Sequence, residues 1–83
     1  MSVEERRTER RVRALKGGHI VFNHSASVID CRIRNLSPHG ALLEVASVVG
    51  VPDRFELRFE DGARRRCAVR RRSATQLGVV FED

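Results

Sequence analysis

Four arginines stand close together near the start of the chain: Arg6, Arg7, Arg10 and Arg11, within the stretch ERRTERRVR. Arg6 and Arg10 are four residues apart, and so are Arg7 and Arg11, so a single helical turn would aim two guanidiniums at one object. A guanidinium grips a phosphate through paired hydrogen bonds, and its fork also matches the O6 and N7 acceptors of guanine. The arginines are therefore a candidate site for a ligand with phosphate and base groups. The alternative is a soluble, flexible terminus.

A second polar group lies in the stretch NLSPHGALLEV, where Asn35 and Ser37 stand two residues apart. Pro38 favours a tight turn, and Gly40 either takes a positive φ or lets another group come close. An asparagine amide both donates and accepts hydrogen bonds, so with the serine hydroxyl it could bind the edge of a nucleobase. Both side chains could instead bond to their own turn, and spacing alone favours that alternative.

The remaining reactive residue types do not form a catalytic or metal-binding pattern. His19, His24 and His39 are scattered, with no nucleophile or ligand partner at a meaningful spacing. Cys31 and Cys67 lack the C-x-x-C spacing of metal sites, and both fall on the apolar phase of alternating runs, as small core residues do. We therefore expect no enzyme activity, no metal and no cofactor.

Charge and length limit the class of protein. The 83 residues allow one domain with a modest core. Sixteen basic residues against 11 acidic ones give a net charge of +5, and every basic residue except Lys16 is arginine. That bias favours a phosphate- or base-containing partner. No apolar run is long enough to span a membrane and no signal peptide is recognisable, so we expect a cytoplasmic protein without membrane insertion.

Alternation of apolar and polar residues with period two dominates after Lys16, which indicates β-strands. It predicts six short strands, at 19–22, 27–34, 41–45, 54–60, 64–72 and 77–81. Strands this short and twisted close into a small antiparallel barrel, which leaves no free edge. We therefore expect an all-β fold, with a flexible arginine-rich arm over residues 1–13 and a six-stranded β-barrel over 14–83. No internal repeat is recognisable, and Arg71 breaks the pattern because alternation would point it inward.

Together, the arginine arm, the N-x-S-x-x-G stretch and the closing LGVVF strand resemble the PilZ domain family. The resemblance implies a six-stranded barrel that binds the bacterial second messenger cyclic di-GMP between its N-terminal arm and its outer surface. Arg7 and Arg11 are similar to the family's R-x-x-x-R pair, and Arg6 to the arginine that often precedes it. The shifted pair Arg6 and Arg10 remains an alternative. Asn35, Ser37 and Gly40 resemble the family's ligand-binding motif on the barrel.

The resemblance implies a small sensor or adaptor, in which ligand binding folds the arm onto the barrel and creates a surface for a protein partner. A homo-oligomer is compatible with the sequence. One alternative is a nucleic-acid-binding basic β-barrel, but such barrels expose aromatic residues, and the chain has no Trp or Tyr and four Phe at inward positions. The other alternative is a protein-interaction module that does not bind nucleotide; the intact motifs argue against it.

Overall fold

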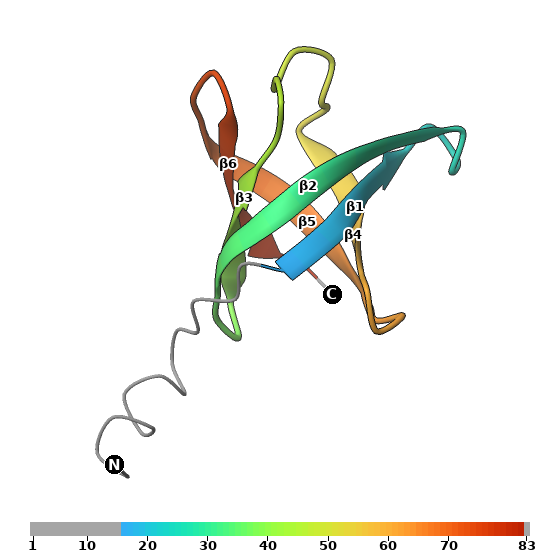
Figure 1. The fold of residues 1–83 in the computed structure, drawn as a ribbon, viewed down its shortest axis with the longest axis vertical. Coiled ribbons are helices and arrows are strands. Elements are labelled where there is room, and N and C mark those ends of the chain that lie inside the picture. The colour runs from blue at the N-terminus through green and yellow to red at the C-terminus, as the bar shows by residue number, and fades with distance from the viewer. Residues whose placement is uncertain (1–15, 83) are drawn as a thin grey trace, which may run out of the picture.

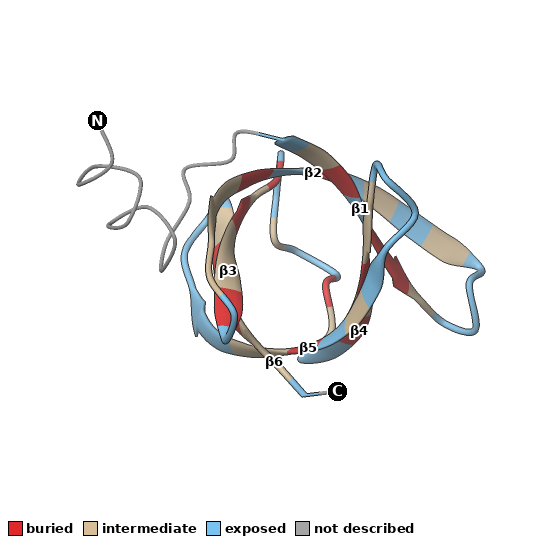
Figure 2. Ribbon diagram, turned by 90° about the horizontal axis from the view of Figure 1, so that it is seen from below, coloured by how far each residue is buried: buried red, intermediate tan, exposed pale blue. Residues whose placement is uncertain are grey.

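The computed structural model describes residues 16–82, and these form an all-β barrel (Figure 1). The strands are β1 (Lys16–Phe22), β2 (Ser27–Leu36), β3 (Gly40–Glu44), β4 (Arg54–Phe59), β5 (Arg64–Arg72) and β6 (Gln76–Phe81). Every pairing is antiparallel, and the order β1-β2-β3-β6-β5-β4 closes on itself, as the end-on view shows (Figure 2). The predicted six-stranded barrel is confirmed, whereas the predicted arm over residues 1–13 lies outside the described residues.

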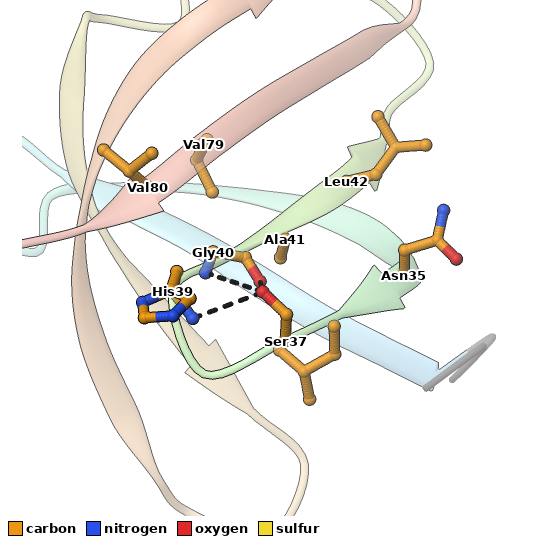
Figure 3. A pocket seen from close by; sticks show the side chains of 9 residues that line it. Asn35, Ser37, His39, Gly40, Ala41, Leu42, Val79 and Val80 are labelled. Atoms are coloured by element: carbon orange, nitrogen blue, oxygen red, sulfur yellow. Dashed lines mark hydrogen bonds between the residues drawn. The ribbon is translucent and has the colours of Figure 1, made fainter. Parts of the chain in front are cut away.

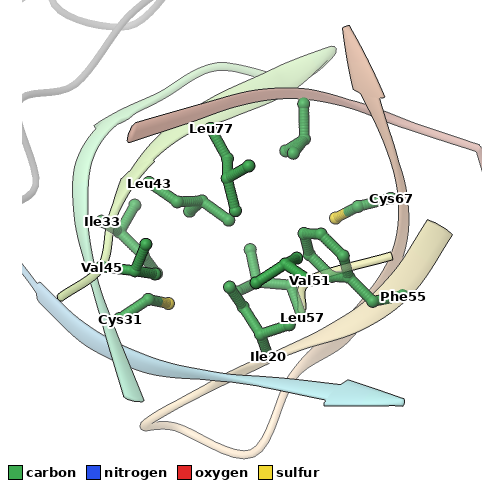
Figure 4. Packing of buried hydrophobic residues seen from close by; sticks show 11 residues of the cluster. Ile20, Cys31, Ile33, Leu43, Val45, Val51, Phe55, Leu57, Cys67 and Leu77 are labelled. Atoms are coloured by element: carbon green, nitrogen blue, oxygen red, sulfur yellow. The ribbon is translucent and has the colours of Figure 1, made fainter. Parts of the chain in front are cut away.

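The core fills the barrel with alternate side chains from every strand (Figure 4). Inward residues exclude water almost completely, since Ile20, Ile33 and Leu57 have no exposed surface. Cys31 and Cys67 are buried and carry free thiols, as their inward phase predicted. Burial of these apolar side chains supplies the main driving force for a sheet this small to close.

Two β-bulges interrupt the alternation of inward and outward side chains, and one of them explains why Arg71 faces outward. In β2 the register shifts between Ile33 and Asn35, and in β5 it shifts between Val69 and Arg71. A bulge places two residues opposite one, so the side chains after it change face relative to simple alternation. Arg71 is therefore exposed, opposite Gly78, and not directed inward as alternation alone predicts.

The two bulged strands also end in the same kind of turn. The Ser37 amide donates to the Gly40 carbonyl at 2.9 Å, and the Gly40 amide donates to the Ser37 hydroxyl at 3.2 Å. In the other turn, the Ser73 amide donates to the Gln76 carbonyl at 2.9 Å, and the Gln76 amide donates to the Ser73 hydroxyl at 3.1 Å. Each bulge thus precedes a four-residue turn held by a serine.

The barrel consists of two equivalent halves, β1-β2-β3 and β4-β5-β6. Leu42 on β3 pairs with Gly78 on β6, and the pairings on both sides of this pair follow a local two-fold axis. A reciprocal pair of hydrogen bonds obeys the same relation: the Val45 amide donates to the Thr75 carbonyl, and the Phe81 amide donates to the His39 carbonyl, both at 2.8 Å. Along β2-β3 and β5-β6, equivalent residues lie 36 positions apart.

Candidate ligand-binding site

A shallow hollow of about 370 Å³ lies against β2, β3 and β6 (Figure 3). Its lining combines an apolar floor with a few polar groups from the turn between β2 and β3. It comprises Asn35, Leu36, Ser37, His39, Gly40, Ala41, Leu42, Val79 and Val80. The structure therefore brings Asn35, Ser37 and Gly40, three of the predicted site residues, to one place on the barrel surface.

Asn35 owes its position to the first bulge. Arg34 is the extra residue of the bulge, so Asn35 pairs with Leu42 and shares its outward face rather than following Ile33 inward. Figure 3 shows the Asn35 side chain standing clear of the turn. Asn35 is a partly buried residue, and its side-chain amide makes no hydrogen bond within residues 16–82. An amide with unused donors and acceptors beside a hollow is suited to bind the edge of a flat polar ligand.

Ser37, in contrast, is engaged in its own turn. Its hydroxyl oxygen accepts hydrogen bonds from the His39 and Gly40 amides, both at 3.2 Å, and the hydroxyl donates to the Gly40 carbonyl at 3.4 Å (Figure 3). One donor and two lone pairs are all that a hydroxyl offers. The turn function of Ser37, the alternative favoured by spacing alone, is therefore present in the structure, and a direct contact with ligand stays a prediction.

Gly40 is required by strand packing. A Cβ on Gly40 would fall on the Val79 carbonyl oxygen and lie 3.2 Å from the carbonyl carbon, across the β3–β6 pairing. The positive-φ glycines of the described chain are Gly50 and Gly62, so Gly40 is a close-approach glycine rather than a left-handed one. The group that comes close is the Val79 backbone; a further approach by ligand stays a prediction.

A second hollow, also of about 370 Å³, adjoins the first and shares Leu36 and Ser37 with it. Its lining is mostly apolar and includes the half-buried rings of two phenylalanines at strand ends. It comprises Lys16, Leu36, Ser37, Pro38, Phe59, Asp61, Ala63, Arg65 and Phe81. The Arg65 guanidinium lies 4.1 Å from the centre of the Phe81 ring, a cation–π contact. Sequence reasoning missed this hollow because it assigned both rings to the interior.

The position of Lys16 links the second hollow to the arginine-rich segment. Lys16 is the first described residue and lines this hollow, so the chain leaves the barrel at its rim. Arg6, Arg7, Arg10 and Arg11, the four arginines predicted to bind ligand, lie outside the described residues.

Within residues 16–82, titratable groups form no cluster of three or more that could hold a metal ion. His19 is tied to Asp30, with Nδ1 3.1 Å from the carboxylate oxygen. Burial, helped by the nearby Asp30 carboxylate, raises the pKa of the Cys31 thiol to about 11, so this thiol stays protonated near neutral pH. No helix in the described part of the chain is long and apolar enough to cross a membrane.

The family model of the PilZ domain matches residues 5–83, nearly the whole chain, including the arginine stretch and both sides of the hollow. The chain is a PilZ domain. The PilZ family is one of cyclic di-GMP-binding receptor domains, and it is not a catalytic family. A comparison with curated proteins found no match, and neither did one with solved structures.

Proposed function

We propose that this PilZ domain binds cyclic di-GMP between the outer hollow beside Asn35 and the arginines Arg6, Arg7, Arg10 and Arg11. The observation that carries the proposal is the Asn35 amide, which the β2 bulge turns outward and which has no hydrogen-bond partner within the described residues. The side-chain atoms of this amide reach solvent, so its donors and its acceptor are available to a ligand. A guanine edge offers matching donors and acceptors.

The arginines supply the charge in this proposal. Arg7 and Arg11 contact the phosphates and a guanine, with Arg6 beside them; the pair Arg6 and Arg10 is the other register compatible with the spacing. Each charged hydrogen bond of this type contributes about 1.5–3 kcal/mol. Two phosphates and two guanines give cyclic di-GMP enough groups to bridge the arginines and Asn35 at the same time.

Binding would act as a switch, because the bound arginine segment covers part of the barrel and presents a new surface to a protein partner. The connection at Lys16 supports this arrangement, since Lys16 lines the second hollow, which shares Leu36 and Ser37 with the first. We propose accordingly that the domain acts as a cytoplasmic adaptor, whose output is a change in partner binding.

Nucleic-acid binding has less support. Single-stranded nucleic acids stack their bases on exposed aromatic side chains. All four phenylalanines lie within the described residues, and none is exposed: Phe55 is buried, and Phe22, Phe59 and Phe81 are partly buried. The ring of Phe81 is also covered by the Arg65 guanidinium.

Calorimetric titration with cyclic di-GMP tests the proposal. We expect the parent to bind at micromolar concentration or tighter, and Arg7→Ala and Asn35→Ala to bind at least about tenfold more weakly. Arg13→Ala is the matched control, because it removes the same charge from the same segment outside the motif. Arg6→Ala and Arg10→Ala then determine which arginine pair is primary.

A folded parent that shows no binding would overturn the proposal. Equal losses in Arg7→Ala and Arg13→Ala would also contradict it, because they would indicate a general effect of positive charge rather than a motif.

A further inference from the structure

Arg71, like its neighbour Arg70, differs from several nearby arginines in having no partner within residues 16–82. Arg72, its neighbour on β5, uses both terminal guanidinium nitrogens: one donates to the Val51 carbonyl and the other to the Asp53 carboxylate, each at 2.9 Å. Arg54 and Arg58 are also held, by Glu82 and Glu56. Arg71 is exposed and makes no ion pair or side-chain hydrogen bond within residues 16–82.

One cross-strand row connects Arg71 to the candidate site. Asn35 on β2 pairs with Leu42 on β3, Leu42 pairs with Gly78 on β6, and Gly78 pairs with Arg71 on β5. All four residues therefore stand on one outward line. The line begins in the hollow with Asn35 and Leu42 and ends at Arg71, about 14 Å from the Asn35 backbone at the usual strand spacing.

Arg71 also contacts this row through the aliphatic part of its side chain. From the position that a Cβ would take on Gly78, the Cβ, Cγ and Cδ atoms of Arg71 lie at 3.4, 3.8 and 3.9 Å. The side chain therefore packs beside Gly78, where no other side chain stands between it and Leu42 on the next strand of the row.

Asn35 and Arg71 are equivalent residues in the two halves of the barrel. Each follows a bulge at an arginine, Arg34 or Arg70, and the local two-fold axis through the Leu42–Gly78 pair exchanges the two positions. The row is thus symmetric in its backbone, with one polar side chain at either end.

The geometry points to Arg71 as a further ligand-binding residue, the counterpart of Asn35 for the second half of the nucleotide. This inference rests on the proposed binding of cyclic di-GMP. That ligand consists of two identical halves, each with a phosphate and a guanine, so a ligand held by Asn35 through one half extends its other half along the row. A guanidinium can pair there with a phosphate or with guanine O6 and N7.

The test compares Arg71→Ala with Arg70→Ala in calorimetric titrations with cyclic di-GMP at two salt concentrations. Arg70 is the matched control because it is exposed, has the same charge and lies next to Arg71, but it is the extra residue of the bulge and does not belong to the row. We expect Arg71→Ala to weaken binding about tenfold, and Arg70→Ala to change it less than twofold. Arg71→Lys should fall between them, since it keeps the charge and loses the fork.

A second measurement uses the parent protein and does not depend on any variant folding. The side-chain Nε–H resonance of Arg71 should shift when cyclic di-GMP is added, and that of Arg70 should not. If the parent binds but Arg71→Ala and Arg70→Ala behave alike and the Arg71 resonance stays in place, the inference is overturned while the proposed function stands. If the folded parent binds no cyclic di-GMP, both fall together.

Discussion

The β2–β3 and β5–β6 hairpins have the same backbone and different side chains. Both contain a bulge at an arginine followed, three residues later, by a serine that holds the turn, and both bury a cysteine at the equivalent position. At the equivalent outward position they carry Asn35 and Arg71. The bulge and the serine therefore set the backbone of each hairpin, whereas the outward side chain sets which chemistry the hairpin presents.

The first position of the second strand also differs between the hairpins. Gly40 begins β3, and a Cβ there would meet the Val79 carbonyl, whereas the equivalent Gln76 begins β6 with a full side chain. A glycine in the N-x-S-x-x-G stretch is therefore explained by the packing of β3 on β6, without any ligand.

Replacing this glycine should produce the largest effect. We expect Gly40→Val to lower the free energy of unfolding by about 3 kcal/mol or more, because the new side chain forces β3 away from β6. The matched variant Gln76→Val should change it by less than about 0.5 kcal/mol. Urea denaturation measures both values. Equal stabilities of the two variants would show that the hairpins tolerate a side chain alike.

The two serines should give smaller effects on stability, with the larger one at Ser37. Ser37→Ala removes a partly buried hydroxyl that accepts hydrogen bonds from two turn amides, and should lower the free energy of unfolding by about 1 kcal/mol. Ser73→Ala removes an exposed hydroxyl that accepts from one amide, and should lower it by about 0.5 kcal/mol. Only Ser37→Ala should also weaken cyclic di-GMP binding, since Ser37 lines the hollow. Thermal unfolding and titration of the same two variants separate the contributions. Unchanged binding in a folded Ser37→Ala protein would restrict Ser37 to its turn.

The smallest expected effect is a pH dependence of stability that comes from the Cys31 thiol. The folded pKa of Cys31, about 11, lies above the ordinary value of 9.0, so its contribution to stability is complete below pH 9 and is lost as the pH rises toward 11. The stability difference between the parent and Cys31→Ala should therefore shrink over this range. Cys67 has Arg66 where Cys31 has Asp30.

Asp30→Arg tests the part that the neighbouring carboxylate plays, because it gives Cys31 an arginine neighbour like that of Cys67. Removal of the carboxylate lowers the pKa of Cys31, so the decline in stability should begin at lower pH. Denaturant unfolding at several pH values checks both variants. If the difference in unfolding free energy between the parent and Cys31→Ala stays constant from pH 9 to 11, the raised pKa of Cys31 is contradicted.

Sequence alternation was sufficient to predict the strands and most of the core, since burial imposes period two on each strand. It placed Ile33, Leu43 and Leu77 in the interior, and all three are fully buried. It could not locate the bulges, because an extra residue in a polar run such as RRR leaves no mark on the apolar pattern. For that reason it misdirected Arg71 and gave no reason for Asn35 to face outward.

The structural equivalence of the two halves could not be predicted from the sequence either. Over residues 27–44 and 63–80, which the two-fold relation superposes, only three positions are identical: Cys31 and Cys67, Arg34 and Arg70, Ser37 and Ser73. Backbone pairing recurs with almost any alternating sequence, so similar hairpins need not share residues. The turn function of Ser37 was foreseen only as an alternative, since spacing does not show where a hydroxyl points.

The closed barrel has a consequence for how quickly the chain folds. Within each half, neighbouring strands pair through short turns, so β1-β2-β3 and β4-β5-β6 can form from local contacts. The two halves meet at two seams, β1–β4 and β3–β6, and only residues 45–53 connect them along the chain. Closing these seams brings distant segments together at a cost in chain entropy, so we expect this step to limit the folding rate. The outward row crosses the β3–β6 seam at Leu42 and Gly78, so Asn35 and Arg71 come to share one surface only when the barrel closes.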